Sequence, residues 1–278
     1  HPNDVGVDYY AGNIGNLSDY YDWSLTVNGI TETSNEYHST SITDLALNWI
    51  TQQTTPWFAW IAYSAPHSPF HLPPEHLHNR DLVGSEEDIN SNKRAYYLAA
   101  IEAMDAEIGR ILNSMDEETR SNTLVIYIGD NGTPKGIIDN SSYGSEHGKG
   151  TLYQGGVAVP LIVSGQGVTR VNEREATLVT ATDLFATIAE VAGSSSTKVN
   201  DSRSFKYLFS DGSVTSEHYI YTAYKSDEVS GWAVRSSDYK LIELADGTQE
   251  LYLLADSFSE NNNLLPTSDP DLLSEVEN

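Results

Sequence analysis

Continuous apolar runs of strand length alternate with helical patterns along much of this chain. The runs WFAWIAY at 57–63, TLVIYIG at 123–129 and VPLIVSG at 159–165 have the composition of strands that are covered on both faces. Between the first two runs, apolar residues recur with helical period over 85–115. This order of strand and helix is typical of an α/β fold, so we expect a mostly parallel sheet flanked by helices.

Two further amphipathic helices are expected in the α/β part of the chain. Ser41 is placed to cap a helix over 42–50. Thr182 or Asp183 is placed to open a later helix, which Gly193 ends. Each helix would bury one apolar side.

The two ends of the chain have a different character. Residues 1–38 show no sustained periodicity, so we expect a surface loop there. Residues 194–216 are polar and Ser-rich, and the short alternating runs beyond them, with an Asp-Gly turn at 246–247, predict a small antiparallel sheet. We therefore expect an α/β domain at 1–200 and a C-terminal antiparallel β subdomain with a terminal tail at 201–278.

The chain is strongly acidic and has no cysteine. Its 278 residues include 40 Asp and Glu against 15 Lys and Arg, and the formal net charge of −25 argues against nucleic acid or an anionic membrane as a partner. The lack of cysteine excludes disulfides, zinc thiolate sites and a cysteine nucleophile within this chain. No apolar run approaches the roughly 20 residues that span a bilayer. An anionic substrate would need local positive charge, from a metal or a Lys side chain.

Polar residues follow the predicted strands, which is where sites gather in open α/β sheets. His67 follows the first strand in a Pro-rich loop, and Asp130 and Asn131 follow the second strand. Lys149 lies with His147 in the long loop before the third strand, and a loop of that length is usually functional. A carboxylate and an amide oxygen are suitable ligands for a hard cation.

Each of these residues also has a structural interpretation. The DNG sequence at 130–132 is a strong turn signal, and it places a glycosylation sequon at Asn131. His67 can cap a Pro-rich turn, and Lys149 and His147 can be ordinary loop residues. The residue pattern by itself leaves these alternatives open.

Seven segments, in order along the chain, resemble the signature blocks of a known family. They are FAWIAYSAPHSPFHLPPEH, YYLAAIEAMDAEIGRIL, TLVIYIGDNG, GKGTLYQGGVAVPLIVSG, TATDLFATIAEVAG, and the closing pair GWAVRSSDYKLIEL and ELYLLADSFSENNNLL. On these blocks the chain resembles the formylglycine-dependent sulfatases, the type I arylsulfatase-like branch of the alkaline phosphatase superfamily. The resemblance covers essentially the whole chain. It implies an alkaline-phosphatase-like fold, with residues 1–200 as part of the catalytic domain.

The resemblance implies a sulfuric ester hydrolase and gives each candidate residue a role. Asp130 and Asn131 would be ligands of one divalent cation, usually calcium, that polarises the sulfate oxygens. Lys149 would contact the sulfate and neutralise its charge, and His67 would contact the ester oxygen and act as general acid. His147 is a further substrate-binding candidate. The substrate implied is a sulfate ester of a carbohydrate or an aryl alcohol.

The resemblance is incomplete at the nucleophile. The family makes formylglycine from Cys or Ser in a C/S-x-P-x-R motif, and this chain has no such motif. We therefore expect a fragment that lacks an N-terminal nucleophile region, a complete metal shell and sulfatase activity of its own. Gln154 and Ala158 stand where the family usually has Glu and Arg, which we interpret as subfamily or structural variation.

Two other functions stay open. A phosphonate or phosphodiester hydrolase of the same superfamily would share the metal and anion site. A non-catalytic remnant or binding module would keep the fold without turnover. The resemblance also implies a periplasmic or secreted location, and the sequence does not indicate an oligomeric state.

Overall fold

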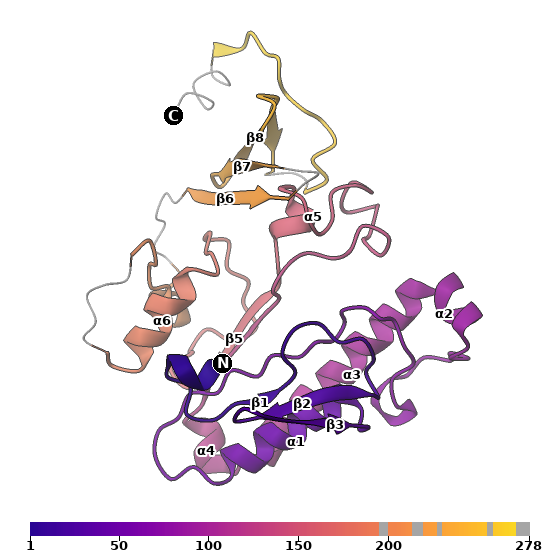
Figure 1. Cartoon of the computed structure of the whole chain (residues 1–278). Helices are drawn as coiled ribbons and strands as arrows, with labels where there is room; N and C mark the ends of the chain where they lie inside the picture. Colours follow the sequence, from indigo (N-terminus) through magenta and orange to yellow (C-terminus); the bar gives the residue numbers. More distant parts are fainter. Residues whose placement is uncertain (195–199, 213–218, 227–229, 255–257, 271–278) are drawn as a thin grey trace. The chain divides into compact units, whose positions relative to one another are not determined.

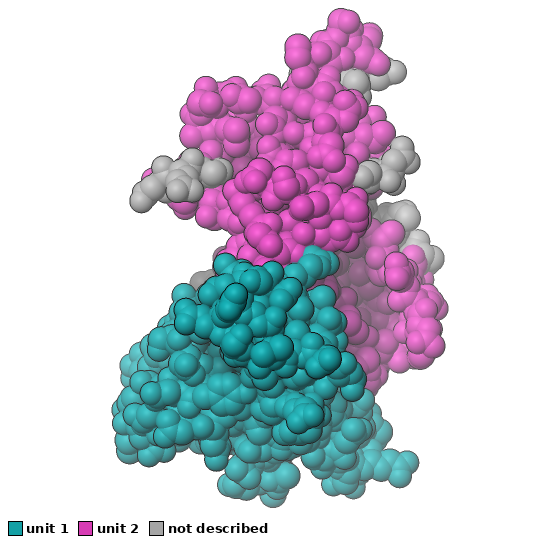
Figure 2. All heavy atoms as spheres, turned by 90° about the vertical axis from the view of Figure 1, so that its right-hand side faces the viewer, with its two compact units in different colours: residues 1–121 teal, residues 122–278 magenta. Residues whose placement is uncertain are grey.

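The computed structural model describes residues 1–194, 200–212, 219–226, 230–254 and 258–270 (Figure 1). The chain divides into two compact units, His1–Ser121 and Asn122–Asn278, which Figure 2 colours separately. The domain boundary expected near residue 200 falls inside the second unit and stays a prediction. Within the described residues, no helix is both long enough and apolar enough to cross a bilayer.

The first unit opens with a three-stranded antiparallel sheet. The short 3-10 helix η1 (Pro2–Val5) precedes strands β1 (Ala11–Gly12), β2 (Trp23–Val27) and β3 (Ile30–Ser34), which pair in that order. Asn28 and Gly29 connect β2 to β3 with φ angles of 46° and 88°, and a two-residue type I′ turn requires positive φ at both positions. The expectation of a loop over 1–38 is therefore wrong, although Asn-Gly between alternating residues is itself a hairpin signal.

Helix α1 (His38–Ile50) begins earlier than its sequence pattern predicts. Tyr37 precedes the helix without a side-chain capping bond, so Ser41 is not the cap and lies buried inside the helix. His38 and Ser39 are also buried. In the sequence, Ser41 looks like a cap because it is a polar residue before an apolar run. In the structure the helix begins three residues earlier, and its first polar residues are buried.

The helix expected over 85–115 is interrupted. It consists of α2 (Glu86–Ser91), capped by the Ser85 side chain, and α3 (Lys93–Ser114). Asn92 separates them with the non-helical angles φ −126° and ψ 32°. The 3-10 helix η2 (Glu75–Leu77) precedes this pair, and α4 (Glu117–Ser121) follows it.

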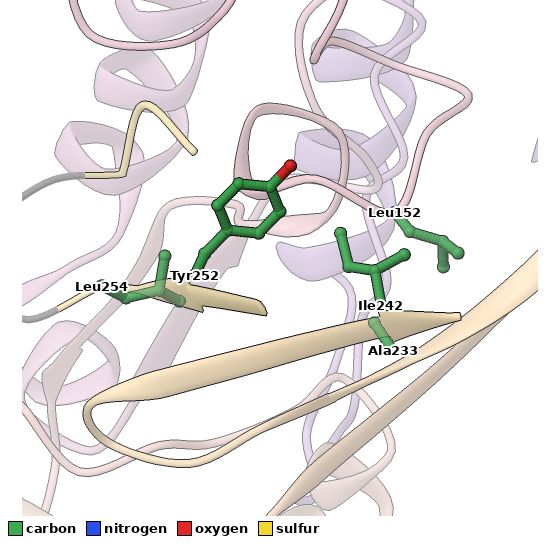
Figure 3. Packing of buried hydrophobic residues seen from close by; sticks show 5 residues of the cluster. All are labelled: Leu152, Ala233, Ile242, Tyr252 and Leu254. Atoms are coloured by element: carbon green, nitrogen blue, oxygen red, sulfur yellow. The ribbon is translucent and has the colours of Figure 1, made fainter. Parts of the chain in front are cut away.

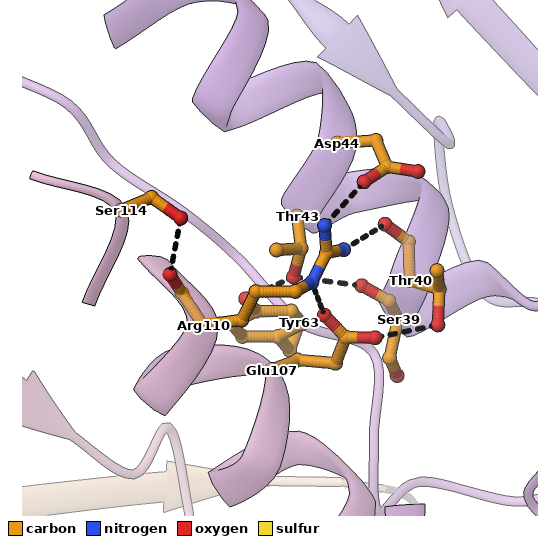
Figure 4. A network of polar contacts seen from close by, with 8 residues as sticks. All are labelled: Ser39, Thr40, Thr43, Asp44, Tyr63, Glu107, Arg110 and Ser114. Atoms are coloured by element: carbon orange, nitrogen blue, oxygen red, sulfur yellow. Dashed lines mark hydrogen bonds and ion pairs between the residues drawn. The ribbon is translucent and has the colours of Figure 1, made fainter. Parts of the chain in front are cut away.

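Helices α1 and α3 pack against each other around a polar network (Figure 4). The Glu107 side chain is 2% exposed and accepts hydrogen bonds from the Thr40 hydroxyl at 2.6 Å and from Arg110 Nε at 2.8 Å. Arg110 also donates to Asp44 Oδ1 at 2.6 Å. Because both oxygens of the buried carboxylate are bonded, its burial carries no unpaired charge.

Segment 57–63 is extended but has no ladder partner among the described residues. Phe58 is 64% and Trp60 is 85% exposed, so the expectation of a strand covered on both faces is wrong for this structure. The opposite face of this segment contacts helix α1, because the Tyr63 and Thr43 hydroxyls share a hydrogen bond of 2.7 Å. An apolar run shows that a segment favours extended backbone, but it does not show which strand pairs with it.

The second unit begins with the strands β4 (Leu124–Ile128) and β5 (Leu161–Gly165), both of which the sequence predicts. They pair antiparallel, with Ile128 opposite Leu161. A parallel pair needs a crossover of a dozen residues or more, usually a helix, and the connection here contains only the four-residue α5 (Gln154–Val157). All strand pairs within the described residues are antiparallel, so the mostly parallel sheet expected from the sequence is not seen among them.

Helix α6 (Asp183–Val191) follows Thr182, where the sequence places a helix start. The 3-10 helix η3 (Lys206–Phe209) comes next among the described helices. Phe205 and Phe209 are buried and lie in a cluster with Leu161 of β5. This aromatic cluster packs against the strand pair.

The C-terminal antiparallel sheet is confirmed. Strands β6 (Ile220–Lys225), β7 (Ser230–Arg235), β8 (Tyr239–Leu244) and β9 (Gln249–Leu253) pair in sequence order. The Asp-Gly turn lies between β8 and β9 as predicted, and Gly247 has a φ of 84°.

One face of this sheet packs against Leu152, which comes from the loop that contains Lys149. Figure 3 shows Leu152 close to Ile242 and Ala233 of the sheet. Leu152 and Ala233 are each 2% exposed, and Ile242 is fully buried. Packing of Leu152 against the sheet therefore holds this part of the loop in place.

Candidate functional site

Asp130 and Asn131 lie just beyond the end of β4, where the sequence places them. Backbone hydrogen bonds hold this strand end: Gly129 N donates to the Pro160 carbonyl at 3.1 Å, and Gly132 N donates to the Gly156 carbonyl at 2.9 Å. Both side chains belong to exposed residues. Asp130 Oδ1 accepts from the Asn131 amide at 2.8 Å, and Asn131 Nδ2 donates to the Gly132 carbonyl at 3.0 Å. Because Nδ2 makes this hydrogen bond, Oδ1 is the atom of the Asn131 side chain that remains as a donor to a cation.

The loop around Lys149 lies tightly against this strand end. Lys149 N donates to the Thr133 carbonyl at 2.8 Å. A Cβ atom at Gly148 would lie 2.6 Å from the Thr133 oxygen, and a Cβ atom at Gly132 would collide with the Gly155 carbonyl. Glycine is required at these two positions because the two backbones approach so closely.

This close approach brings Asn131 and Lys149 to one hollow of about 190 Å³. The other lining residues come from the same loop, from α5 and from β6: Gly150, Thr151, Gly156, Val157, Thr222, Ala223 and Tyr224. None of the described residues that line the hollow is acidic. In a chain with a net charge of −25, the described lining of this hollow therefore includes a lysine and an asparagine but no carboxylate.

A buried ion pair supports the loop on its other side. Lys240 of β8 donates to Glu260 Oε1 at 2.8 Å, and the two side chains are 2% and 0% exposed. Glu260 Oε2 accepts from the Gln154 backbone amide at 2.5 Å, at the start of α5. Burial lowers the pKa of Lys240, and the Glu260 charge acts in the opposite direction. The sequence interpretation missed this pair.

Gln154 completes this polar cluster without adding charge. Its Oε1 accepts from Lys240 Nζ at 3.2 Å, and the residue is 1% exposed. A glutamate at 154 would place a second buried carboxylate beside Glu260 and the single Lys240 ammonium. Repulsion between the two carboxylates would disfavour ionisation of both. The amide at 154 is therefore consistent with the local charge balance.

His147 lies outside the lining of the hollow. Its ring stacks on Tyr153 with centroids 3.7 Å apart, and its Nδ1 lies 3.1 Å from the Ser259 carbonyl. The Tyr153 hydroxyl donates to Glu250 at 2.8 Å, and burial followed by this carboxylate raises the Tyr153 pKa. The structure thus gives His147 a packing role, and its substrate contact stays a prediction.

His67 belongs to the first unit and is exposed. Its backbone is held at both ends, because His67 N donates to the Ser64 carbonyl at 2.9 Å and the Tyr20 hydroxyl donates to the His67 carbonyl at 2.8 Å. Its Nδ1 lies 2.7 Å from the Ser68 carbonyl. Since a carbonyl only accepts, Nδ1 carries the proton, and Nε2 is the nitrogen that is left for other chemistry.

Comparison with known proteins identifies the family of this chain. The family model described as Sulfatase matches residues 2–194. The chain belongs to the sulfatase family. A sulfatase from Formosa agariphila is 32% identical over 237 residues, a match that covers 76% of this chain and 42% of the relative. The chain thus spans less than half the length of this sulfatase.

Two solved structures show the fold of this sulfatase chain. The crystal structure of Ps i-CgsB in complex with k-i-k-neocarrahexaose has a TM-score of 0.82 at 21% identity and covers 100% of this chain and 67% of that one. The structure of BT4656 in complex with its substrate D-glucosamine-2-N,6-O-disulfate has a TM-score of 0.80 at 17% identity and covers 98% and 74%. These likenesses confirm the alkaline-phosphatase-like fold.

Sulfatases generally use a divalent metal and formylglycine. Asp130 and Asn131 provide one carboxylate and one amide oxygen of the kind that hard cations prefer. Among the described residues, however, no three His, Asp or Glu side chains gather closely enough to hold a metal. The donors described here therefore do not form a complete shell by themselves.

Proposed function

We propose that the protein containing this chain hydrolyses sulfate esters of a carbohydrate or an aryl alcohol. The observation that carries the proposal is the hollow in which Lys149 and Asn131 meet without an acidic neighbour among the described lining residues. A sulfate ester is an anion, and a strongly acidic protein repels anions at long range. Binding therefore depends on concentrated local positive charge, which Lys149 supplies.

In this proposal Lys149 neutralises negative charge on the sulfate oxygens, and Asn131 lies beside the same group. A preorganised cation in a narrow hollow stabilises charge that develops as the ester bond breaks. Asp130 and Asn131 are proposed as two ligands of a divalent cation, because oxygen donors suit a hard cation, and calcium is the favoured ion by family resemblance. No residue of this chain is assigned as nucleophile.

His67 is proposed as the general acid for the leaving alcohol. A poor leaving group needs a proton as its bond to sulfur breaks, and a positioned imidazolium can donate it. The Ser68 carbonyl fixes the Nδ1 proton, so Nε2 is the atom that would transfer a proton to the ester oxygen. His67, in the first unit, is therefore proposed to contribute the proton.

The sugar-bound relatives support a sulfated carbohydrate as substrate class. One fold neighbour was solved with its substrate, an O-sulfated glucosamine, and another with an oligosaccharide. A periplasmic or secreted location is proposed with this substrate class, by family resemblance.

The test compares two lysines of the second unit in the full-length protein that carries this chain. Lys149→Ala is expected to lower kcat/KM for sulfate esters about 100-fold or more, the usual cost of removing a charge-stabilising group. Lys135→Ala is the matched control, because Lys135 is 45% exposed, makes an ion pair of 3.5 Å with Glu146 and does not line the hollow. Equal activities of the two variants would contradict the role of Lys149. Faster turnover of a phosphonate monoester than of any sulfate ester would favour the alternative hydrolase function.

A further inference from the structure

Strand β6 forms one wall of the hollow that contains Lys149. It is an edge strand of the C-terminal sheet, since β7 is its one neighbour in the described strand order. Along β6 the residues alternate between half-buried and exposed, with Thr222 and Tyr224 on the half-buried side and Tyr221 65% exposed on the other. Thr222 and Tyr224 both line the hollow. The strand thus presents two hydroxyl side chains to the place where Lys149 lies.

The Tyr224 side chain is held by packing of its ring. Its ring packs against the cluster that includes Leu152 and Ile242. Its hydroxyl lies beside Gly150, where an added Cβ atom would be 3.4 Å from the oxygen. Gly150 directly follows Lys149, so the hydroxyl lies next to the backbone of the cationic residue. Neither the Tyr224 hydroxyl nor the Thr222 hydroxyl has a hydrogen-bond partner within the described part of the chain.

The remaining walls of the hollow distinguish between a sugar and an aryl group. Apart from the hydroxyls, the cation and the amide, its lining consists of Gly150 and Gly156, the small apolar side chains of Val157 and Ala223, and the ring of Tyr224, which already packs against the Leu152 cluster. A flat aromatic group gains affinity from extended apolar or aromatic walls, which such sites usually provide. Two hydroxyls that lack partners instead favour a ligand with hydroxyl groups of its own, because each neutral hydrogen bond adds modest but directional stabilisation.

We propose that Thr222 and Tyr224 are specificity-determining residues that hydrogen-bond the sugar hydroxyl next to the sulfate held by Lys149. This inference rests on the proposed sulfatase function and adds the surface that selects the alcohol. Tyr224 donates to a sugar oxygen, and Thr222 can donate or accept. The bound alcohol is accordingly a carbohydrate in preference to an aryl group.

Conservative variants on the two faces of β6 test the proposal. Tyr224→Phe and Thr222→Val are compared with Tyr221→Phe, the matched control on the exposed face, in the full-length protein. The substrates are a panel of monosaccharide O-sulfates and 4-nitrophenyl sulfate. Tyr224→Phe is expected to lower kcat/KM for the best sugar sulfate about 3- to 10-fold, the effect of one neutral hydrogen bond, with less than about a twofold change for the aryl sulfate. The control changes neither.

Binding to residues 1–278 separates this inference from the proposed function. Affinities for the same sugar sulfates and for inorganic sulfate are measured by titration calorimetry. A selective loss of sugar-sulfate binding in Tyr224→Phe supports the inference even if the full-length protein shows no turnover, which would overturn only the sulfatase proposal. Equal loss for sugar sulfate and inorganic sulfate, no loss for either, or no sugar-sulfate binding by the parent chain would overturn the inference.

Discussion

His38 shows how one buried side chain constrains the first unit. It is fully buried, its Nε2 lies 2.8 Å from Asn13 Oδ1, and its ring packs edge-on against Trp23 at 4.6 Å. Its Nδ1 is buried without a partner in the described structure. Burial, followed by the charge of His71, lowers the His38 pKa to about 4. The neutral imidazole is therefore the form that the fold accommodates.

This environment predicts an acid-sensitive fold. The unfolded chain binds a proton at His38 near its ordinary pKa of about 6.5, whereas the folded chain resists protonation until pH about 4. The stabilising contribution is present above pH about 6.5 and is lost as the pH falls toward 4, at an eventual cost of about 3 kcal/mol. NMR titration of the His38 ring, together with urea unfolding at several pH values, measures both parts. A His38 ring that titrates near pH 6.5 in the folded protein would contradict the prediction.

At the level of elements, the loop with Lys149 depends on contacts that come from distant parts of the sequence. Glu260 joins Lys240 of β8 to the amide that starts α5, so one carboxylate connects the C-terminal segment, the sheet and the loop. Removing one partner of a buried ion pair leaves the other charge uncompensated, which costs more than the pair itself contributes. Loop geometry and sheet stability are consequently coupled through this carboxylate.

Glu260→Ala is expected to lower the free energy of unfolding by about 3–5 kcal/mol, because it leaves the Lys240 ammonium buried and unpaired. The double variant with Lys240→Met and Glu260→Leu is expected to recover most of this loss, since apolar replacement of a buried pair is often neutral. Glu190→Ala, which removes the exposed pair with Lys206 at 3.7 Å, is the control and should cost less than about 1 kcal/mol. Chemical denaturation measures all three. A Glu260→Ala effect as small as that of the control would show that the ion pair does not support the loop.

The sequence predicted elements well where their signals are local. The strands at β4, β5 and β6–β9 and the start of α6 follow from apolar pattern and turn residues. Strand pairing is not local: the direction of β5 relative to β4, and the lack of a ladder partner for 57–63 among the described residues, depend on segments elsewhere in the chain. The sequence does contain a signal for Lys240: it alternates with Ile242 on the same side of β8, and a charged residue on a buried side requires a partner. Asn131 and Lys149 were candidates because they lie in the loops next to predicted strands, the family resemblance supplied their roles, and the structure brings both to one hollow.

For the whole molecule, the balance between charge and metal ligands leads to a last prediction. Asp130 and Asn131 supply one charge and at most three oxygens, while calcium takes about six to eight oxygen ligands. The described residues contain no cluster of three His, Asp or Glu that would add to them, and the chain spans 42% of the length of its Formosa relative. We expect residues 1–278 to bind calcium with a Kd of about 1 mM or weaker.

With such a Kd, 1 mM calcium adds at most about 0.4 kcal/mol to the stability of residues 1–278. Thermal unfolding in 150 mM KCl, which screens nonspecific attraction to the acidic surface, measures the shift. Asp130→Asn is the matched variant: in residues 1–278 it should change the calcium response little, whereas in the full-length protein it should abolish the stabilisation by calcium. Micromolar calcium binding by residues 1–278 that disappears in Asp130→Asn would contradict the prediction. It would mean that other oxygens of this chain, such as backbone carbonyls near the glycine-rich loop, complete the shell around Asp130 and Asn131.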